Sequence, residues 1–302
     1  MIAALFPGQG SQVIGMARDL YDHNAAAKRA LNEAEAALPG LLELMWSGPE
    51  ETLSLTANQQ PALVAAGVAA YRAYEEAGGA KPDVLAGHSL GEFSAHVVAG
   101  SLSLTDAVRL VRKRGEYMQE AVPAGRGAMA AVLKTDRAHI ERVCAETPGV
   151  AEIANLNAPE QTVVSGEAAA VQAAAERLKA EGARVVMLNV SAPFHCSLMR
   201  PAAERLAADL AQVHFSKPEL PIVTNVTADA LTSVDEAPAL LERQVTAPVR
   251  WVETLEKLQE LGATRFLEFG SGKVLSGLVK RTLGDVDARA VTDTKSLEEA
   301  LA

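Results

Sequence analysis

The chain has 302 residues, which predicts one or two domains and a core large enough to need no disulfide staples. Hydrophobic residues make up 49% and charged residues 22%, as in an ordinary globular protein. The formal net charge of −10 argues against general attraction to nucleic acid or to an anionic membrane surface.

The cysteine content and the apolar runs indicate a cytoplasmic protein. Cys144 and Cys196 are too few for a disulfide framework or a metal site, and they suit a reducing cytosol. The N-terminal sequence MIAALFPGQG has no basic region and only a short apolar run, unlike a signal peptide. The longest apolar stretch, PALVAAGVAAYRAY, is broken by Arg72 before the ~20 residues that a membrane span needs.

Strand-like and helix-like segments alternate along much of the chain. Strands are predicted at IAALF (2–6), VLAG (84–87) and RFLEFG (265–270). Helices are predicted over 25–38, 61–77, 90–99 and 104–122. This alternation favours an α/β fold with a mostly parallel sheet.

The middle of the chain has a different order of elements. A strand GAMAAVL (127–133) and a helix over 136–146 are followed by a hairpin of VAEIANLN and QTVVSG, a helix over 168–181 and the strand ARVVMLNV (183–190). This β-α-β-β-α-β order is typical of a ferredoxin-like unit. We therefore predict a small α+β domain over 127–189, inserted into a large domain formed by 1–126 and 190–302.

The segment GHSLG (87–91) matches the pattern G-x-S-x-G between a predicted strand and a predicted helix. A serine at such a sharp turn presents its Oγ, and free N–H groups at the helix start can stabilise an oxyanion. The alternative is a glycine-rich turn with an idle serine. The strand before and the helix after Ser89 favour a nucleophile.

A serine nucleophile needs a base. The chain has six histidines: His23, His88, His96, His139, His195 and His214. His88 is adjacent to Ser89 and is expected to point elsewhere, whereas the contexts of the other four suit solvated or structural side chains. His195 follows a predicted strand in a loop, SAPFHCS, and loops at strand carboxyl ends are where α/β sheets build their sites. His195 is therefore the best candidate for the base, although a loop histidine can also be purely structural.

A second glycine-rich loop, FPGQGSQ (6–12), also follows a predicted strand. Its backbone amides and Gln9 can complete an oxyanion hole, whereas the alternative is a simple strand-to-helix turn. It is not a dinucleotide fingerprint, because Val13 occupies the position of the third glycine. GSGK (270–273) is not a P-loop, because Leu267 replaces the required earlier glycine.

The helix predicted over 104–122 carries one cation on its apolar side. A step of ~100° per residue groups most of its charged side chains on one arc. Arg114 instead falls between Leu110 and Met118, within the apolar sector. A guanidinium there needs an anion or access to water, so Arg114 is either a structural ion pair, a snorkelling side chain or a clamp for a substrate carboxylate.

Taken together, these segments resemble the malonyl-CoA:acyl-carrier-protein transacylase family, which includes acyltransferase domains of fatty-acid and polyketide synthases. The resemblance spans essentially the whole chain and includes FPGQGSQ, GHSLGEF, SAPFHC and GSGKVLSGLVKR in the family's order. The chain departs from the family pattern at Ala247 and Ser271, which many members replace with asparagine and proline.

The resemblance implies a large α/β-hydrolase-like domain with a ferredoxin-like insert, and ping-pong transfer of malonyl through a Ser–His dyad without an acidic third member. The resemblance implies that Ser89 is the nucleophile, His195 the base and Arg114 the ligand of the malonyl carboxylate. It also implies that Gln9 and Leu90 form the oxyanion hole, that the Gln244 carbonyl orients the histidine, and that Phe194 contributes to substrate selectivity. Malonyl-CoA and acyl carrier protein are the expected partners, with no metal or redox cofactor.

The carrier protein of this family is usually acidic, so docking requires a local basic patch on this acidic chain. The candidates are Arg109, Arg112, Lys113, Lys273, Lys280 and Arg281. We expect a monomer that serves fatty-acid synthesis. The alternatives are a serine esterase or thioesterase, a trans-acting acyltransferase of a polyketide pathway, and a non-catalytic module that binds a carrier protein.

Overall fold

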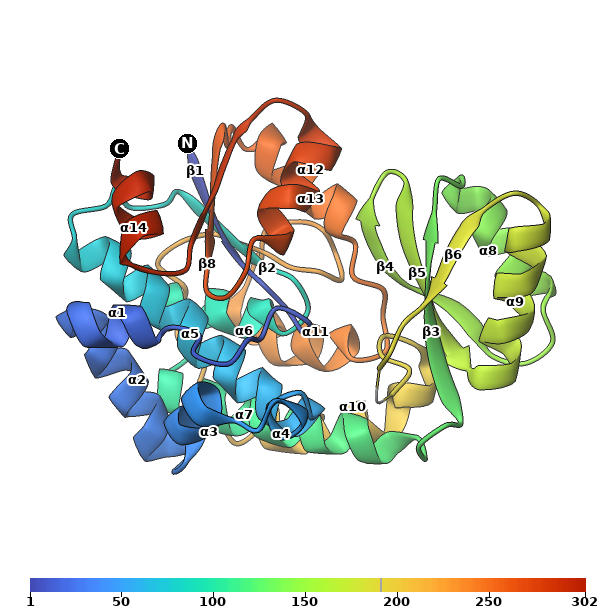
Figure 1. Cartoon of the computed structure of the whole chain (residues 1–302), viewed down its shortest axis with the longest axis horizontal. Helices are drawn as coiled ribbons and strands as arrows, with labels where there is room; N and C mark the ends of the chain where they lie inside the picture. Colours follow the sequence, from blue (N-terminus) through green and yellow to red (C-terminus); the bar gives the residue numbers. More distant parts are fainter. Residues whose placement is uncertain (191) are drawn as a thin grey trace.

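Two β-sheets organise the chain, each with its own covering helices (Figure 1). The structure is a computed structural model that describes residues 1–190 and 192–302. Ser191, the first residue of the segment SAPFHC, lies outside the described residues. Cys144 and Cys196 are both buried and unpaired.

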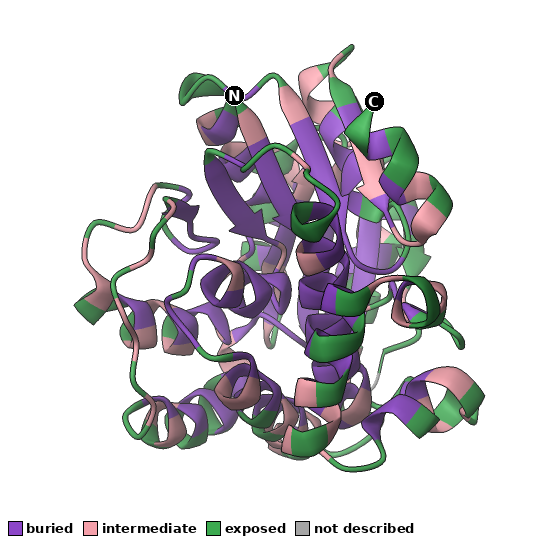
Figure 2. Ribbon diagram, turned by 90° about the vertical axis from the view of Figure 1, so that its left-hand side faces the viewer, coloured by how far each residue is buried: buried purple, intermediate pink, exposed green. Residues whose placement is uncertain are grey.

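The larger sheet has the strand order β7-β2-β1-β8-β9, and every neighbouring pair is parallel. Its strands are β1 (Ile2–Phe6), β2 (Val84–Gly87), β7 (Ile222–Val223), β8 (Arg265–Phe269) and β9 (Asp287–Val291). Alternate residues of β1 face different cores: Ala4 and Phe6 join one apolar cluster, and Ala3 and Leu5 join the other. Both faces are therefore buried, as expected for a parallel sheet (Figure 2).

Most of the helices contribute to the apolar cluster on one face of this sheet. They are α1 (Arg18–His23), α2 (Ala25–Ala37), α3 (Leu41–Ser47), α4 (Glu50–Leu53), α5 (Thr56–Glu76), α6 (Gly91–Val98), α7 (Leu104–Ala121), α10 (Arg200–Leu210), α11 (Ala237–Gln244) and α14 (Thr294–Leu301). The opposite face packs against α12 (Trp251–Glu260) and α13 (Val274–Leu283). Short 3-10 helices lie at η1 (Ser197–Met199) and η2 (Val234–Glu236).

The close packing of α5 against α7 explains a difference from the sequence-based expectation. Helix α5 begins at Thr56, before the predicted start at residue 61, and Pro61 lies within it. A Cβ at Gly115 of α7 would lie 2.6 Å from Ala57 Cα, so only glycine allows this approach. The packing keeps the turn before Pro61 helical, and this turn carries Gln60 toward α7.

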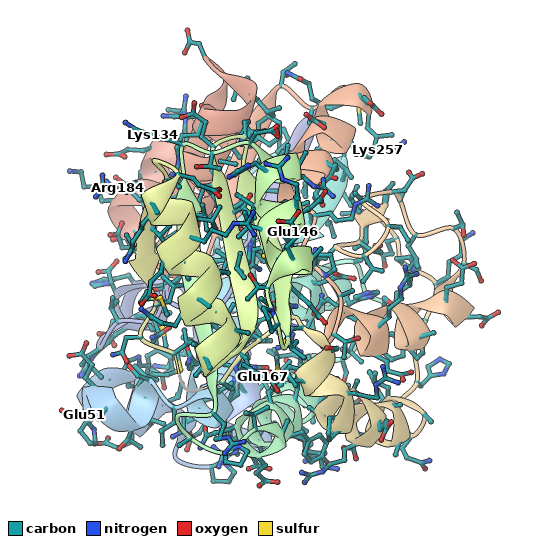
Figure 3. The ribbon with its side chains drawn as sticks, turned by 90° about the vertical axis from the view of Figure 1, so that its right-hand side faces the viewer. Glu51, Lys134, Glu146, Glu167, Arg184 and Lys257 are labelled. Atoms are coloured by element: carbon teal, nitrogen blue, oxygen red, sulfur yellow. The ribbon has the colours of Figure 1, made fainter. Side chains whose placement is uncertain are left out.

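The smaller sheet is antiparallel, with the order β4-β5-β3-β6. Its strands are β3 (Gly127–Leu133), β4 (Ala151–Ala158), β5 (Gln161–Glu167) and β6 (Arg184–Met187), with α8 (Arg137–Glu146) and α9 (Ala168–Ala180) packed on it over a separate apolar cluster. Figure 3 shows the side that these helices cover, with Glu146 and Arg184 on its surface. Strand β6 is shorter than the predicted 183–190. The two sheets confirm the predicted fold class.

Candidate active site

Ser89 lies on a sharp turn between β2 and α6. Its φ is 51°, a left-handed conformation that is uncommon for a non-glycine residue and worth a functional explanation. The flanking glycines have no room for a side chain: a Cβ at Gly87 would lie 1.9 Å from the Gly91 carbonyl carbon, and one at Gly91 would lie 2.0 Å from Phe6 O. These glycines therefore let α6 begin directly against the end of β1.

The side chain of His195 reaches Ser89 from the loop before η1. Its Nε2 lies 2.7 Å from Ser89 Oγ, and its Nδ1 lies 2.9 Å from the carbonyl oxygen of Gln244. Because a carbonyl only accepts, Nδ1 carries the hydrogen and Nε2 accepts from the serine hydroxyl. The two residues singled out in the sequence are thus in contact, with exposed fractions of only 6% for Ser89 and 4% for His195.

Burial sets the charge of this imidazole. Burial and, to a smaller extent, the positive charge of Arg114 lower the pKa of His195 to about 3, against the opposing effect of the hydrogen bond to the Gln244 carbonyl. His195 is therefore neutral at neutral pH. A neutral imidazole with a free Nε2 lone pair is the form that can take a proton from Ser89.

Arg114 is fully buried on α7, as its place on the apolar side of that helix predicted. Its Nη1 donates to Gln60 Oε1 at 3.0 Å, and its Nη2 donates to Ser89 Oγ at 3.2 Å and to Gln244 Oε1 at 3.1 Å. Burial lowers the pKa of Arg114 to about 10, so the side chain stays charged at neutral pH. A buried cation thus touches the candidate nucleophile.

Of the two expected oxyanion-hole residues, Leu90 directly follows Ser89, and Gln9 is connected to the site through Gln60. The Ser89 N–H donates to Asn225 Oδ1 at 2.6 Å and is therefore occupied. Leu90 is buried, and its N–H lies at the start of α6, where helix donors have no intrahelical acceptor. Gln9 is half-buried in the loop after β1, and its Oε1 accepts from Gln60 Nε2 at 3.3 Å. This bond leaves the Gln9 amide group free to donate.

Phe194 is buried, with an exposed fraction of 7%, in the apolar cluster that covers one face of the larger sheet. It directly precedes His195, whose φ of 58° is also left-handed. The ring therefore anchors the loop that carries the histidine.

Three polar residues at the site were not identified from the sequence: Gln60, Glu92 and Asn225. Glu92 is fully buried in the first turn of α6 and accepts from Gln244 Nε2 at 2.7 Å. An acidic residue inside an apolar helix start was a usable signal. No comparable signal marked Gln60, which lies just before the predicted helix, or Asn225, which follows a strand of only two residues.

His88 and His96, the histidines nearest to Ser89 in the sequence, have other partners. His88 Nε2 lies 2.8 Å from Asn157 Oδ1, and His96 Nδ1 lies 3.2 Å from Ser101 Oγ. Burial lowers the pKa of His96 to about 4, which keeps it neutral.

The six basic docking candidates belong to two separate helices, α7 near the bottom of Figure 1 and α13 near the top. Arg109, Arg112 and Lys113 lie on α7, and Lys273, Lys280 and Arg281 lie at or within α13. On α7, Arg112 pairs with Glu116 at 2.7 Å and Lys113 pairs with Asp209 at 2.5 Å. Two of the three α7 cations are thus paired within the protein, which makes the α13 group the better candidate for binding an acidic partner.

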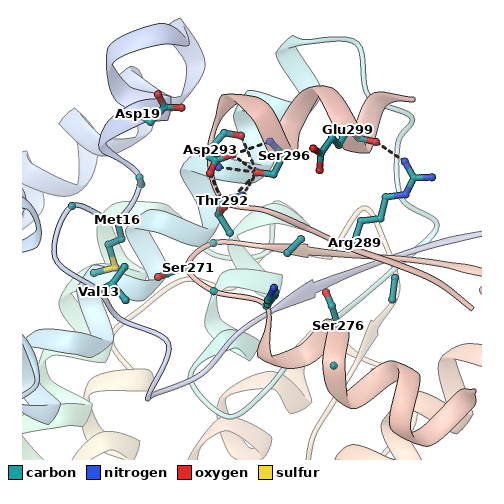
Figure 4. A pocket seen from close by; sticks show the side chains of 18 of the residues that line it. Val13, Met16, Asp19, Ser271, Ser276, Arg289, Thr292, Asp293, Ser296 and Glu299 are labelled. Carbon is teal, nitrogen blue, oxygen red and sulfur yellow. Dashed lines mark hydrogen bonds between the residues drawn. The ribbon is translucent and has the colours of Figure 1, made fainter.

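A groove opens beside this α13 group (Figure 4). Its volume is about 950 Å³, and its lining includes residues 13–17, Lys273, Lys280 and part of α14. The Ser271 hydroxyl donates to the Ser11 carbonyl at 2.5 Å. This bond ties the rim of the groove to the loop that carries Gln9.

None of the helices within 1–190 and 192–302 is long and apolar enough to cross a membrane. Over the same ranges, no cluster of three or more histidine, cysteine or acidic side chains could hold a metal ion.

Comparison with known proteins identifies the family. The family model described as "Acyl transferase domain" matches residues 4–297. A malonyl CoA-acyl carrier protein transacylase of Bacillus subtilis is 47% identical, with 99% of this chain and 96% of the relative covered.

Two solved structures are similar in fold over nearly the whole chain. The malonyl CoA-acyl carrier protein transacylase of Coxiella burnetii has a TM-score of 0.97 at 42% identity, with 99% of this chain and 96% of that chain covered. A malonyl-transacylase in complex with a type II PKS acyl-carrier protein has a TM-score of 0.96 at 45% identity, with coverages of 99% and 98%. The chain therefore belongs to the acyl transferase family that contains the malonyl CoA-acyl carrier protein transacylases.

Proposed function

We propose that the protein transfers malonyl from malonyl-CoA to the phosphopantetheine thiol of acyl carrier protein, through a malonyl ester of Ser89. The observation that carries this proposal is the position of Ser89 Oγ, 2.7 Å from His195 Nε2 and 3.2 Å from Arg114 Nη2. One oxygen thus contacts both a neutral base and a buried cation. A nucleophile, its base and a ligand for an acidic acyl group are what malonyl transfer requires.

The first half-reaction forms the acyl-enzyme. His195 Nε2 takes the proton of Ser89 Oγ as the oxygen attacks the thioester carbonyl carbon. The carbonyl oxygen becomes an oxyanion, which accepts from the Leu90 N–H and the Gln9 amide. The C–S bond then breaks, and the coenzyme A thiolate takes the proton from His195.

The second half-reaction reverses these roles. His195 takes a proton from the phosphopantetheine thiol, whose sulfur attacks the malonyl ester of Ser89. Collapse of the tetrahedral intermediate breaks the C–O bond, and Ser89 Oγ recovers its proton from His195. The Gln244 carbonyl, 2.9 Å from His195 Nδ1, fixes the tautomer through both steps. No acidic side chain is needed to orient the histidine.

Substrate choice follows from Arg114. A malonyl group brings a carboxylate that can form charge-assisted hydrogen bonds with the guanidinium, whereas an acetyl group leaves that buried cation without its anion. Acylation by malonyl-CoA is therefore favoured over acylation by acetyl-CoA by the free energy that it costs to leave a buried charge unpaired. We assign Phe194 a secondary part, in which its bulk limits the size of the acyl group beside His195.

The docking surface for the carrier protein is assigned to Lys273, Lys280 and Arg281. These cations suit an acidic partner, and the similar complex of a malonyl-transacylase with its acyl-carrier protein supports a carrier protein as the acceptor. The domain division at 1–126 with 190–302 and at 127–189 stays a proposal, supported by the separate apolar cluster of the smaller sheet. A monomeric state and a cytoplasmic location stay predictions from the sequence.

The test is a transfer assay with malonyl-CoA and a holo acyl carrier protein, followed by intact mass spectrometry of the carrier. We expect the carrier to gain a malonyl group as coenzyme A is released, and Ser89→Ala to abolish both. Release of coenzyme A with free malonate and no malonyl-carrier would instead identify a thioesterase. Transfer retained by Ser89→Ala would refute the serine mechanism.

A further inference from the structure

Glu92 is a buried carboxylate three residues after the nucleophile, and the mechanism above gives it no part. It is fully buried in the first turn of α6. Its Oε2 accepts from the Asn225 N–H at 3.0 Å and from Gln244 Nε2 at 2.7 Å. Its Oε1 has no hydrogen-bond partner among the described residues. Burial of an acidic group with one oxygen unpaired is costly, so its presence beside the nucleophile calls for an explanation.

One of these bonds connects Glu92 to the serine turn. Asn225, which Glu92 holds through its backbone, accepts from the Ser89 N–H at 2.6 Å and donates through Nδ2 to the Gly87 carbonyl at 2.6 Å. Both ends of the left-handed turn are therefore fixed by one asparagine. The position of that asparagine depends on Glu92.

The other bond connects Glu92 to the base and to the cation. Gln244 Nε2 donates to Glu92 and to the Ser89 carbonyl, and Gln244 Oε1 accepts from Arg114. The backbone carbonyl of the same glutamine accepts from His195 Nδ1. A single amide thus separates the Glu92 carboxylate from the Arg114 guanidinium, and its residue also orients the histidine.

We propose that Glu92 is a positioning residue with two effects, the first being to hold Asn225 and Gln244 so that Ser89 and His195 stay aligned. The second is to supply the negative charge that offsets Arg114 until the substrate carboxylate arrives. This inference rests on the proposed malonyl transfer. In this arrangement the Glu92 carboxylate contacts Gln244, which in turn contacts His195. In a catalytic triad the carboxylate contacts the histidine directly.

The negative charge of Glu92 is present only where the pH exceeds the pKa of this carboxyl group. Burial raises the pKa of Glu92 to about 7, although the hydrogen bonds from Asn225 and Gln244 and the charge of Arg114 act in the opposite direction. A malonyl carboxylate bound to Arg114 brings a second negative charge close to Glu92. The two anions oppose each other, so the Glu92 charge weakens malonyl binding and has no comparable effect on an uncharged acetyl group.

Two variants separate the two effects, and single-turnover acylation by malonyl-CoA and by acetyl-CoA is the readout. Glu92→Gln keeps an oxygen for Asn225 and Gln244 but removes the charge. We expect the malonyl-CoA concentration that gives half-maximal acylation to fall by about fivefold, and that for acetyl-CoA to stay unchanged. Glu92→Asp keeps the charge but moves the carboxylate away from Asn225 and Gln244. The maximal acylation rates with malonyl-CoA and with acetyl-CoA should therefore both fall by about tenfold, and the preference for malonyl over acetyl should not change.

Glu268→Gln is the matched control. Glu268 is also a buried carboxylate, with an exposed fraction of 1%, but it accepts from Leu275 N and Ser276 N at the start of α13, away from Ser89. We expect this variant to acylate like the wild type.

Three results would overturn the proposal. In the first, Glu92→Gln changes the two half-saturating concentrations alike. In the second, Glu92→Asp acylates at the wild-type rate, a result that is decisive even if Glu92→Gln does not fold. In the third, Glu268→Gln reproduces the pattern of the Glu92 variants. Wild-type protein that forms no malonyl-enzyme would instead refute the proposed function and, with it, this inference.

Discussion

Replacement of Arg114 by alanine should convert a malonyl-selective site into one that no longer prefers malonyl. The guanidinium is fully buried and is held by hydrogen bonds to Gln60, Ser89 and Gln244. Without it, a malonyl carboxylate enters an apolar site that offers no cation. Loss of one partner of a buried charge pair costs about 3–5 kcal/mol, and entry of water into the vacated space reduces this cost. At about 3 kcal/mol, acylation by malonyl-CoA falls by about a hundredfold.

Single-turnover acylation of Ser89, followed by intact mass spectrometry with malonyl-CoA and acetyl-CoA in parallel, measures this change. Arg114→Ala should lose about a hundredfold with malonyl-CoA and much less with acetyl-CoA, which has no carboxylate. Arg112→Ala is the control, because it removes a half-buried arginine of the same helix that pairs with Glu116. Equal losses with both substrates would refute the assignment of Arg114 as the carboxylate ligand and would indicate a structural role.

Three further predictions address the base, the turn and the docking surface. Because burial lowers the pKa of His195 from 6.5 to about 3, the base stays unprotonated, and the maximal acylation rate should change little from about pH 8 to about pH 5; a fall centred near pH 6.5 would contradict this. The same shift means that only the unfolded chain protonates this histidine just below pH 6.5, so its contribution to the free energy of unfolding decreases as the pH falls. Gly91→Ala should destabilise the protein by about 2 kcal/mol in urea unfolding, because its Cβ would meet Phe6 O at 2.0 Å, whereas Gly277→Ala, with nothing within 4 Å, should be neutral or slightly stabilising. Lys280→Glu combined with Arg281→Glu should slow transfer to carrier protein at low salt and leave acylation by malonyl-CoA unchanged; unaltered transfer would reject this surface.

The parts of the site that sequence reasoning identified are those with a local signal. Ser89 lies between two glycines at a strand-to-helix change, so its turn is encoded within five residues. Arg114 is conspicuous because a helix of known period carries it on the apolar side. His195 was one of six histidines, and before the family resemblance was considered it was favoured by its place in a loop after a strand and by its separation in sequence from Ser89.

The residues that were missed act through contacts distant in sequence. Asn225 meets Ser89 across 136 positions, and Gln244 meets Glu92 across 152. No local pattern encodes such contacts, because they depend on how the parallel strands are ordered in the sheet. The start of α5 was misplaced for a similar reason: the packing of Gly115 against Ala57, and not local propensity, keeps the turn before Pro61 helical.

The central claim is that Ser89 carries the malonyl group, and the most direct measurement is to find that group on the protein. The chain would be mixed briefly with malonyl-CoA, quenched in acid and digested, and the modified peptide would be sequenced by mass spectrometry. We predict a malonyl ester on Ser89 in the wild type, no adduct in Ser89→Ala, and removal of the adduct from the wild type when holo acyl carrier protein is added. A malonyl group on any other residue, or carrier protein malonylated at the wild-type rate by Ser89→Ala, would contradict this account.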